Sequence, residues 1–153
     1  MKNKISYSKV LLVNAKPTLV FKAITVEIDK WWTVYSNKTK KTGDKLSVKF
    51  GENTFKTMKL TKVILNQVIH WKVEQANIDI KGLSRKNEWV GTTIKWEIEK
   101  NKNGSKINFT HQGLIPEFEC YNACEGGWDY FLNSLADFLN KGKGTPHFIK
   151  NNN

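Results

Sequence analysis

A long amphipathic helix near the end of the chain limits the folds that this sequence can adopt. Large apolar side chains recur every three or four residues over 127–142, at Trp128, Phe131, Leu132, Leu135, Phe138 and Leu139. This spacing is typical of a helix with one wide buried face, and Gly142 is placed to cap its end. We expect the helix to begin near Glu117 and to end at Lys141. At 1.5 Å per residue it would be about 37 Å long, enough to cross a whole sheet.

The chain before this helix is rich in strand patterns. We expect strands over residues 5–13, 45–50, 55–65, 69–73, 88–100 and 106–111, with a hairpin turn at residues 103–104. Short helices are expected after Pro17 and over 27–32, and a long loop over 76–87. The sequence therefore predicts an α+β fold, in which a curved antiparallel sheet of about seven strands carries two short helices and one long C-terminal helix across its concave face.

Two details of this pattern lead to local predictions. Trp89 has the opposite parity to Trp96 in the strand expected over 88–100, so its side chain is expected on the outer face unless a bulge intervenes. Gly126 and Gly127 fall inside the long helix, where each glycine costs about 1 kcal/mol relative to alanine. That cost predicts either a close contact between the helix and the sheet or a break of the helix before Trp128.

Length and hydropathy indicate one domain without a membrane span. The 153 residues suit a single domain, which we assign to residues 1–144, with a flexible tail over 145–153. No segment approaches the roughly 18 apolar residues of a membrane-spanning helix. The apolar run that follows the basic first residues is too short for a signal peptide. A cytoplasmic location is therefore expected.

The charge of the chain is concentrated in its first half. The net charge is +11, and residues 1–62 alone carry 14 lysines against 4 acidic residues. Such a surface either is simply solvated or attracts nucleic acid, anionic lipid or an acidic protein partner. Only one of the 25 basic residues is an arginine, Arg85, which disfavours nucleic acid as the partner because base and phosphate recognition relies on the planar fork of arginine.

The sequence contains no evident catalytic or metal-binding constellation. Cys120 and Cys124 are four residues apart, a spacing that we interpret as two small apolar residues on a buried helix face. Glu97 and Glu99 are expected on the outer face of the sheet, so no inward carboxylate pair is available. We therefore predict no catalytic residue, no bound metal and no cofactor.

Four short motifs, in this order, resemble a known family. They are AKPTLVFKAI at 15–24, KWW at 30–32, THQGL at 110–114 and GW at 127–128. Together they resemble the SRPBCC superfamily, which has the helix-grip fold of START and birch-pollen-allergen-like domains, and within it the branch named for the C-terminal domain of the activator of Hsp90 ATPase. The resemblance covers residues 8–142. It implies the helix-grip fold, whereas function varies across the superfamily, from lipid carriers to polyketide cyclases.

The inward aromatic side chains are the candidate lining of a pocket between the sheet and the last helix. Trp71, Trp96, Phe109 and Trp128 either line one cavity or form a tightly packed core. His111 shares a face with Phe109, and is either a polar anchor or proton donor in that pocket or a core histidine bonded to the backbone or to Tyr121. The full set of pocket candidates is Trp32, Trp71, Trp96, Phe109, His111, Tyr121, Trp128 and Phe131.

Three functions follow from these observations, in decreasing order of support. The first is binding of a small apolar or amphipathic molecule, suggested by the aromatic inner face and the family resemblance. The second is an interaction module, similar to a chaperone regulator, in which the basic first half docks on an acidic protein. The third is an enzyme of the cyclase kind that uses His111 as an acid or base.

Overall fold

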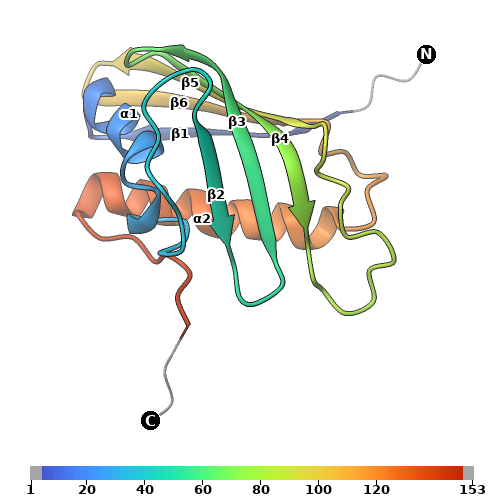
Figure 1. Ribbon diagram of the computed structural model, residues 1–153. Helices are drawn as coiled ribbons and strands as arrows, with labels where there is room; N and C mark the ends of the chain where they lie inside the picture. The colour runs from blue at the N-terminus through green and yellow to red at the C-terminus, as the bar shows by residue number, and fades with distance from the viewer. Residues whose placement is uncertain (1–4, 150–153) are drawn as a thin grey trace.

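Six strands and two α-helices make up the part of the chain that the structure, a computed structural model, describes: residues 5–149. In chain order the elements are β1 (Tyr7–Val13), α1 (Pro17–Thr25), the 3-10 turn η1 (Ile28–Lys30), β2 (Lys45–Lys49), β3 (Phe55–Ile64), β4 (Val68–Asn77), β5 (Thr93–Asn101), β6 (Gly104–Gln112) and α2 (Tyr121–Lys141). Figure 1 shows the sheet curving over α2.

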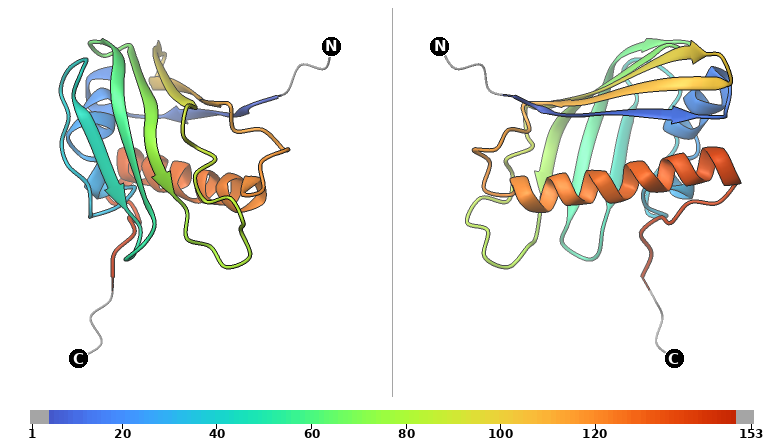
Figure 2. Two further views of the ribbon diagram at one scale, coloured as in Figure 1. Left: turned by 45° about the vertical axis from the view of Figure 1, so that its right-hand side comes forward. Right: turned by 180° about the vertical axis from the view of Figure 1, so that it is seen from behind.

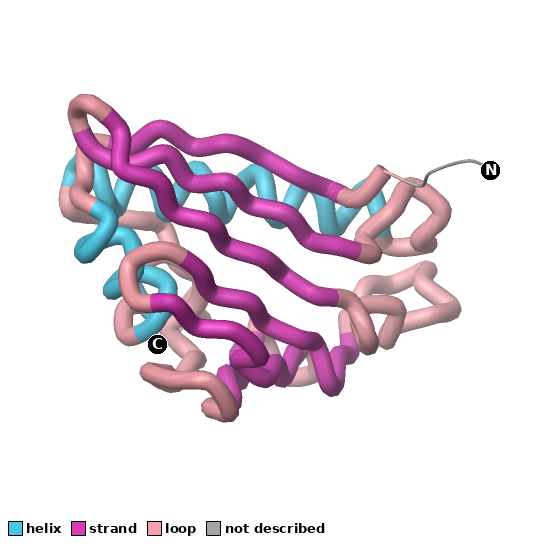
Figure 3. The backbone as a smooth tube through the Cα atoms, turned by 90° about the horizontal axis from the view of Figure 1, so that it is seen from above, coloured by secondary structure: helices cyan, strands magenta, loops and turns pink. Residues whose placement is uncertain are grey.

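The strands form one antiparallel sheet in the order β1-β6-β5-β4-β3-β2, so the first and last strands of the chain are neighbours. The tube view in Figure 3 shows the six strands side by side, with α2 beneath them. Seen from behind in Figure 2, α2 crosses the concave face. The predicted helix-grip architecture is confirmed, but the sheet has six strands, one in each of the six expected ranges, rather than about seven.

The shorter β5 changes the position of Trp89. This strand begins at Thr93 rather than at residue 88, so strand parity does not apply to Trp89, which is buried and not on the outer face as predicted. From Ile94 onward the predicted alternation holds, and Ile94, Trp96 and Ile98 are buried. The hairpin that follows turns through residues 102–103, since Asn101 pairs with Gly104.

Helix α2 begins at Tyr121, four residues later than predicted, because the carboxylate of Glu88 binds the chain ahead of it. The two oxygens of Glu88 accept hydrogen bonds from the backbone N–H groups of Glu119 and Cys120, at 3.0 and 3.1 Å. At the other end Gly142 takes the left-handed conformation and donates its N–H to the Phe138 carbonyl, as expected for a glycine cap. The second short helix reduces to the single turn η1.

The core is a layer of aromatic rings between the sheet and the helices. Trp31, Trp71, Trp96 and Phe109 are fully buried, and the burial of each large apolar side chain contributes about 1.5–3 kcal/mol. Their rings meet mostly edge to face; the centroids of Trp96 and Phe109, for example, lie 4.6 Å apart. This layer therefore holds α2 and η1 against the strands.

The end of the chain that the structure describes lies against the segment after η1. His147 donates its backbone N–H to Trp32 and accepts one from Val34, which makes a short parallel bridge at Thr33. Thr145 donates its N–H to the Ser134 hydroxyl of α2 at 2.7 Å. The remainder of the tail expected over 145–153 lies outside the described residues from 150 onward.

Candidate functional site

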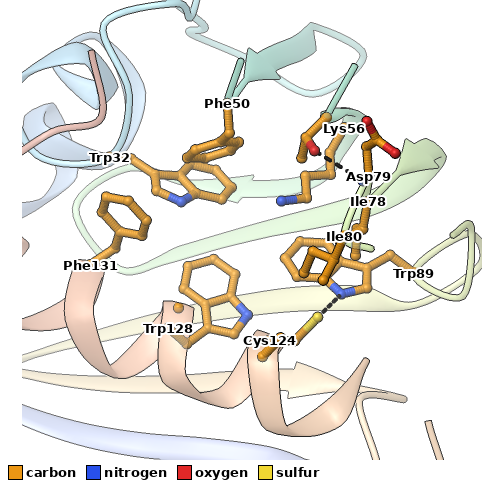
Figure 4. A pocket seen from close by; sticks show the side chains of 13 residues that line it. Trp32, Phe50, Lys56, Ile78, Asp79, Ile80, Trp89, Cys124, Trp128 and Phe131 are labelled. Atoms are coloured by element: carbon orange, nitrogen blue, oxygen red, sulfur yellow. Dashed lines mark hydrogen bonds between the residues drawn. The ribbon is translucent and has the colours of Figure 1, made fainter. Parts of the chain in front are cut away.

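A pocket of about 340 Å³ opens between the sheet, the loop over 78–92 and the first half of α2. Its volume lies within the range of about 300–1,000 Å³ that is usual for small-molecule sites. Most of its walls are aromatic or aliphatic (Figure 4). The lining residues are Trp32, Phe50, Thr54, Lys56, Ile78, Asp79, Ile80, Trp89, Ala123, Cys124, Gly127, Trp128 and Phe131.

One face of α2 forms the floor of the pocket. Cys124, Trp128 and Phe131 follow one another at the spacing of a helix face. Between them lies Gly127, where a β-carbon would meet no other atom within 4 Å. The glycine pair therefore neither touches the sheet nor breaks the helix, contrary to both predicted alternatives. At Gly127 the missing side chain instead leaves space that belongs to the pocket.

The first residues of the 78–92 loop form the opposite wall. Ile78 donates its backbone N–H to the Lys86 carbonyl at 2.7 Å, which closes the loop on itself. Asp79 donates its N–H to the Thr54 hydroxyl at 3.0 Å, which ties the loop to the turn before β3. Ile78 is buried whereas Ile80 is 39% exposed, so the mouth of the pocket lies beside Ile80.

Two glutamates fasten this loop to the start of α2. Besides Glu88, which binds the backbone ahead of the helix, Glu119 accepts hydrogen bonds from the backbone N–H of Arg85 at 2.7 Å and from the Ser84 hydroxyl. The bond from the Arg85 backbone holds the pKa of Glu119 below its ordinary value. These contacts couple the loop wall of the pocket to its helical floor.

Lys56 of β3 places a buried ammonium group in the pocket wall. Lys56 is 8% exposed, and it is the only lysine among the buried residues that the structure describes. The Nζ atom lies 4.4 Å from the ring centroid of Phe50 and 4.5 Å from that of Trp89. Burial lowers the pKa of Lys56 to about 8, because it disfavours the charged form.

A pair of thiols lies at the start of α2: Cys124 lines the pocket, and Cys120 is the residue immediately before the helix. The sulfur atoms of Cys120 and Cys124 are 2.7 Å apart, and the indole Nε1–H of Trp89 donates to the Cys124 sulfur at 3.2 Å. The contact with Cys124, together with burial, raises the pKa of Cys120. The pair helps to fix the Trp89 ring, which forms part of the wall.

His111 lies deeper, where its two nitrogens belong to a continuous chain of hydrogen bonds that runs from Trp128 to the Trp89 carbonyl. Trp128 donates its Nε1–H to His111 Nδ1 at 3.0 Å, so His111 Nε2 must carry the proton and donate it to the Thr92 hydroxyl at 2.8 Å. That hydroxyl in turn donates to the Trp89 carbonyl at 2.6 Å. Burial, aided by the charge of Lys56, lowers the pKa of His111 to about 3, which keeps the ring neutral.

The residues predicted for the pocket fall into four groups. Trp32, Trp128 and Phe131 line it, whereas Trp71, Trp96 and Phe109 lie in the packed core and do not line this cavity. His111 is buried in the hydrogen-bonded chain beneath the pocket floor. The remaining candidate, Tyr121, is half-buried, donates its hydroxyl to Glu125 at 3.2 Å and does not line the pocket either.

Sequence reasoning missed Lys56, although a signal for it was present. In the strand expected over 55–65, Lys56 lies at alternate positions with the apolar residues Met58 and Leu60, and all three are buried. A lysine at an inward position should have been read as a candidate for the site. Phe50 gave the same kind of signal, because it shares parity with the buried Leu46 and Val48 in the strand expected over 45–50. The loop residues 78–80 gave no comparable signal, because the path of a loop is not periodic.

Metal ligation and membrane insertion find no support within residues 5–149. No group of three or more histidine, cysteine or acidic side chains in this range could hold a metal ion. Likewise, none of the helices described has the length and apolarity that crossing a membrane requires.

Solved structures with the same fold are numerous. The chain is similar to the Aha1 dimer from Colwellia psychrerythraea, with a TM-score of 0.75, 25% identity, and coverage of 92% of this chain and 99% of that one. Protein SSP2350 from Staphylococcus saprophyticus gives a TM-score of 0.70 at 16% identity, over 92% and 96% of the two chains. Bacillus halodurans protein BH1534 gives 0.63 at 16% identity, over 91% and 99%.

Sequence comparison identifies the family. No curated protein sequence matches the chain. The sequence profile of one family, however, matches residues 14–140, which is most of the chain and includes strands β2 to β6, the short helices and nearly all of α2. This extent agrees with the order of motifs and with the helix-grip architecture. The chain belongs to the family described as activator of Hsp90 ATPase homolog 1-like protein.

Proposed function

We propose that the protein binds a small molecule with an apolar body in the pocket between the 78–92 loop and α2. The observation that carries the proposal is the pocket itself, with about 340 Å³ of space between rings contributed by the sheet, the loop and the helix. Trp32 and Trp128 stack with their centroids 5.1 Å apart, and Trp89 and Trp128 stack with their centroids 5.8 Å apart. A row of flat rings beside open space favours a flat or ring-containing ligand.

The first test is mass spectrometry of the purified protein under native and then denaturing conditions. A mass that drops on denaturation reveals a small molecule that was purified with the protein, and gives its formula. If the masses agree, the second test uses the neutral fluorescent probe N-phenyl-1-naphthylamine. The proposal expects fluorescence to rise on binding to the pocket and to saturate with one probe per chain.

The glycine pair of α2 provides matched variants for this test. Gly127→Leu places a side chain in the pocket, whereas Gly126→Leu, one residue away, adds the same side chain at an exposed position that does not line it. Probe binding should be lost in Gly127→Leu and kept in Gly126→Leu. Equal binding by both variants, or no probe binding by the unmodified chain, would contradict the proposal.

A second candidate function rests on the outer face of the sheet. Lys59 and Lys72 are exposed and lie directly opposite one another across β3 and β4, next to Lys45 of β2, whose ammonium pairs with Glu74 at 3.2 Å. Like charges in directly opposed positions destabilise a sheet, and an acidic protein docked on this face would relieve their repulsion. Binding of this kind should weaken steeply between 50 and 200 mM salt. A double variant, Lys59→Gln with Lys72→Gln, should abolish it and leave the pocket unaffected.

A further inference from the structure

The pocket contains one charged group that has no counterion. Besides the Cys124 thiol, whose pKa is lowered mainly by its contact with Cys120, the lining residues that can carry a charge are Lys56 and Asp79. The Asp79 carboxylate is engaged at the rim, where the Lys86 ammonium lies 3.6 Å away. None of the hydrogen bonds or ion pairs found between described residues involves the ammonium of Lys56.

The surroundings of this ammonium hold it in place without neutralising it. The rings of Phe50 and Trp89 attract the cation through their π faces. The titratable groups that face it are the thiols of Cys120 and Cys124 on α2, and the neutral imidazole of His111 on β6. With a pKa of about 8, Lys56 keeps its proton in roughly nine of ten molecules at pH 7.

Burial of an unpaired charge is costly, so a lysine at this position calls for an explanation. A methionine would fill the same inward position of β3 at no electrostatic cost. Figure 4 shows the Lys56 amine in the space between Phe50 and Trp89. An anionic group of a ligand, placed in that space, would supply the missing counterion.

We infer that the ligand of this pocket is a small organic acid, whose apolar body lies against the tryptophan rings and whose anionic group pairs with the Lys56 ammonium. This inference rests on the proposed function and specifies the chemical class of its ligand. The volume of about 340 Å³ is near the lower limit for ligand sites. It therefore favours an acid with one or two rings over a long-chain lipid.

The test compares two probes that share one framework. 8-Anilinonaphthalene-1-sulfonate is N-phenyl-1-naphthylamine with one added sulfonate, so the ratio of their dissociation constants measures the preference for an anion. The unmodified chain should bind the sulfonate at least tenfold more tightly. In Lys56→Met that preference should disappear, while the neutral probe binds as before. Lys59→Met, on the outer face of the same strand, is the matched control and should keep the preference.

The outcomes separate this inference from the function on which it rests. The pocket is supported if the neutral probe binds to Lys56→Met but not to Gly127→Leu. This conclusion does not depend on the affinity for the sulfonate. If Lys56→Met then retains the preference for the sulfonate, the role of Lys56 is overturned. Displacement of the bound sulfonate by 1-naphthoate supports a free organic acid as the ligand. Displacement by anionic phospholipid vesicles, but not by 1-naphthoate, would contradict it in favour of a lipid headgroup.

Discussion

Lys56 and His111 are two buried basic side chains of the same concave face, and their surroundings differ in kind. His111 has a partner for each nitrogen, Trp128 on one side and Thr92 on the other, and is neutral. Lys56 has only the faces of two rings beside it and keeps its charge at neutral pH. A buried polar group that is fully satisfied serves the fold, whereas one left unpaired beside open space is available to a ligand.

The same contrast separates the two halves of the aromatic interior. Around Trp71 and Trp96 the rings fill the space, and the indole N–H groups of both have no hydrogen-bond partner among the described residues. Around Trp32 and Trp89 the rings form walls with room between them. An aromatic sequence composition therefore does not distinguish a packed core from a pocket; the loop and the glycine that border the space do.

The largest expected effect comes from breaking the hydrogen-bonded chain at His111. In His111→Leu the buried N–H of Trp128 loses its acceptor and the Thr92 hydroxyl loses a donor. Each unsatisfied buried group costs about 1–3 kcal/mol, so we expect the free energy of unfolding to fall by about 2–4 kcal/mol at pH 7. Denaturant unfolding measures this change. His70→Leu, on the outer face, is the control and should stay within about 0.5 kcal/mol; an equal loss in both variants would refute the structural role of His111.

Acid should weaken the fold through the same residue. The unfolded chain takes up a proton at His111 below its ordinary pKa of 6.5, whereas the folded chain resists protonation down to about pH 3. The unfolded state thus binds more protons in this range, and stability falls with pH. Between pH 6.5 and 4.5, above the titration of most carboxylates, the loss should reach about 2–3 kcal/mol. Unfolding curves of His111→Leu should lack this slope, and those of His70→Leu should retain most of it.

Lys56→Met should act in the opposite direction and stabilise the protein. Removing an unpaired buried charge is expected to raise the free energy of unfolding by on the order of 1–3 kcal/mol at pH 7, after the loss of the ring contacts is subtracted. In the unmodified chain the unfolded lysine keeps its proton up to about pH 10.5 and the folded one only to about 8. Stability should therefore rise between these values, and in Lys56→Met that rise should be absent. A destabilised Lys56→Met would mean that this lysine serves the fold, as His111 does.

Much of the fold could be predicted, because its signals are periodic. The apolar stripe of α2 and the alternation in β3 and β5 depend only on neighbours along the chain. The packed tryptophans were also placed correctly on the inner face by parity. The pocket could not be located, since its walls depend on how Glu88 and Glu119 fasten a loop that has no period.

The glycine pair of α2 gives the smallest stability effect and the finest test of the contrast between packing and open space. Both glycines lie in a continuous helix, and a β-carbon at either would meet no atom within 4 Å. Gly126→Ala and Gly127→Ala should therefore each stabilise the protein by up to about 1 kcal/mol, through helix propensity alone.

Of the two glycines, only Gly127 lines the pocket. The two variants should therefore differ in their affinity for the probe and show the same gain in the free energy of unfolding. N-Phenyl-1-naphthylamine should bind a few-fold more weakly to Gly127→Ala than to Gly126→Ala, because the added methyl group takes up space that the probe would use. Unequal gains in stability would show that a neighbour does contact one of the positions. Equal gains with equal binding would show that the space beside Gly127 is not used by the probe. Equal gains in stability with weaker probe binding to Gly127→Ala would show that the missing side chain at Gly127 serves the ligand and not the fold.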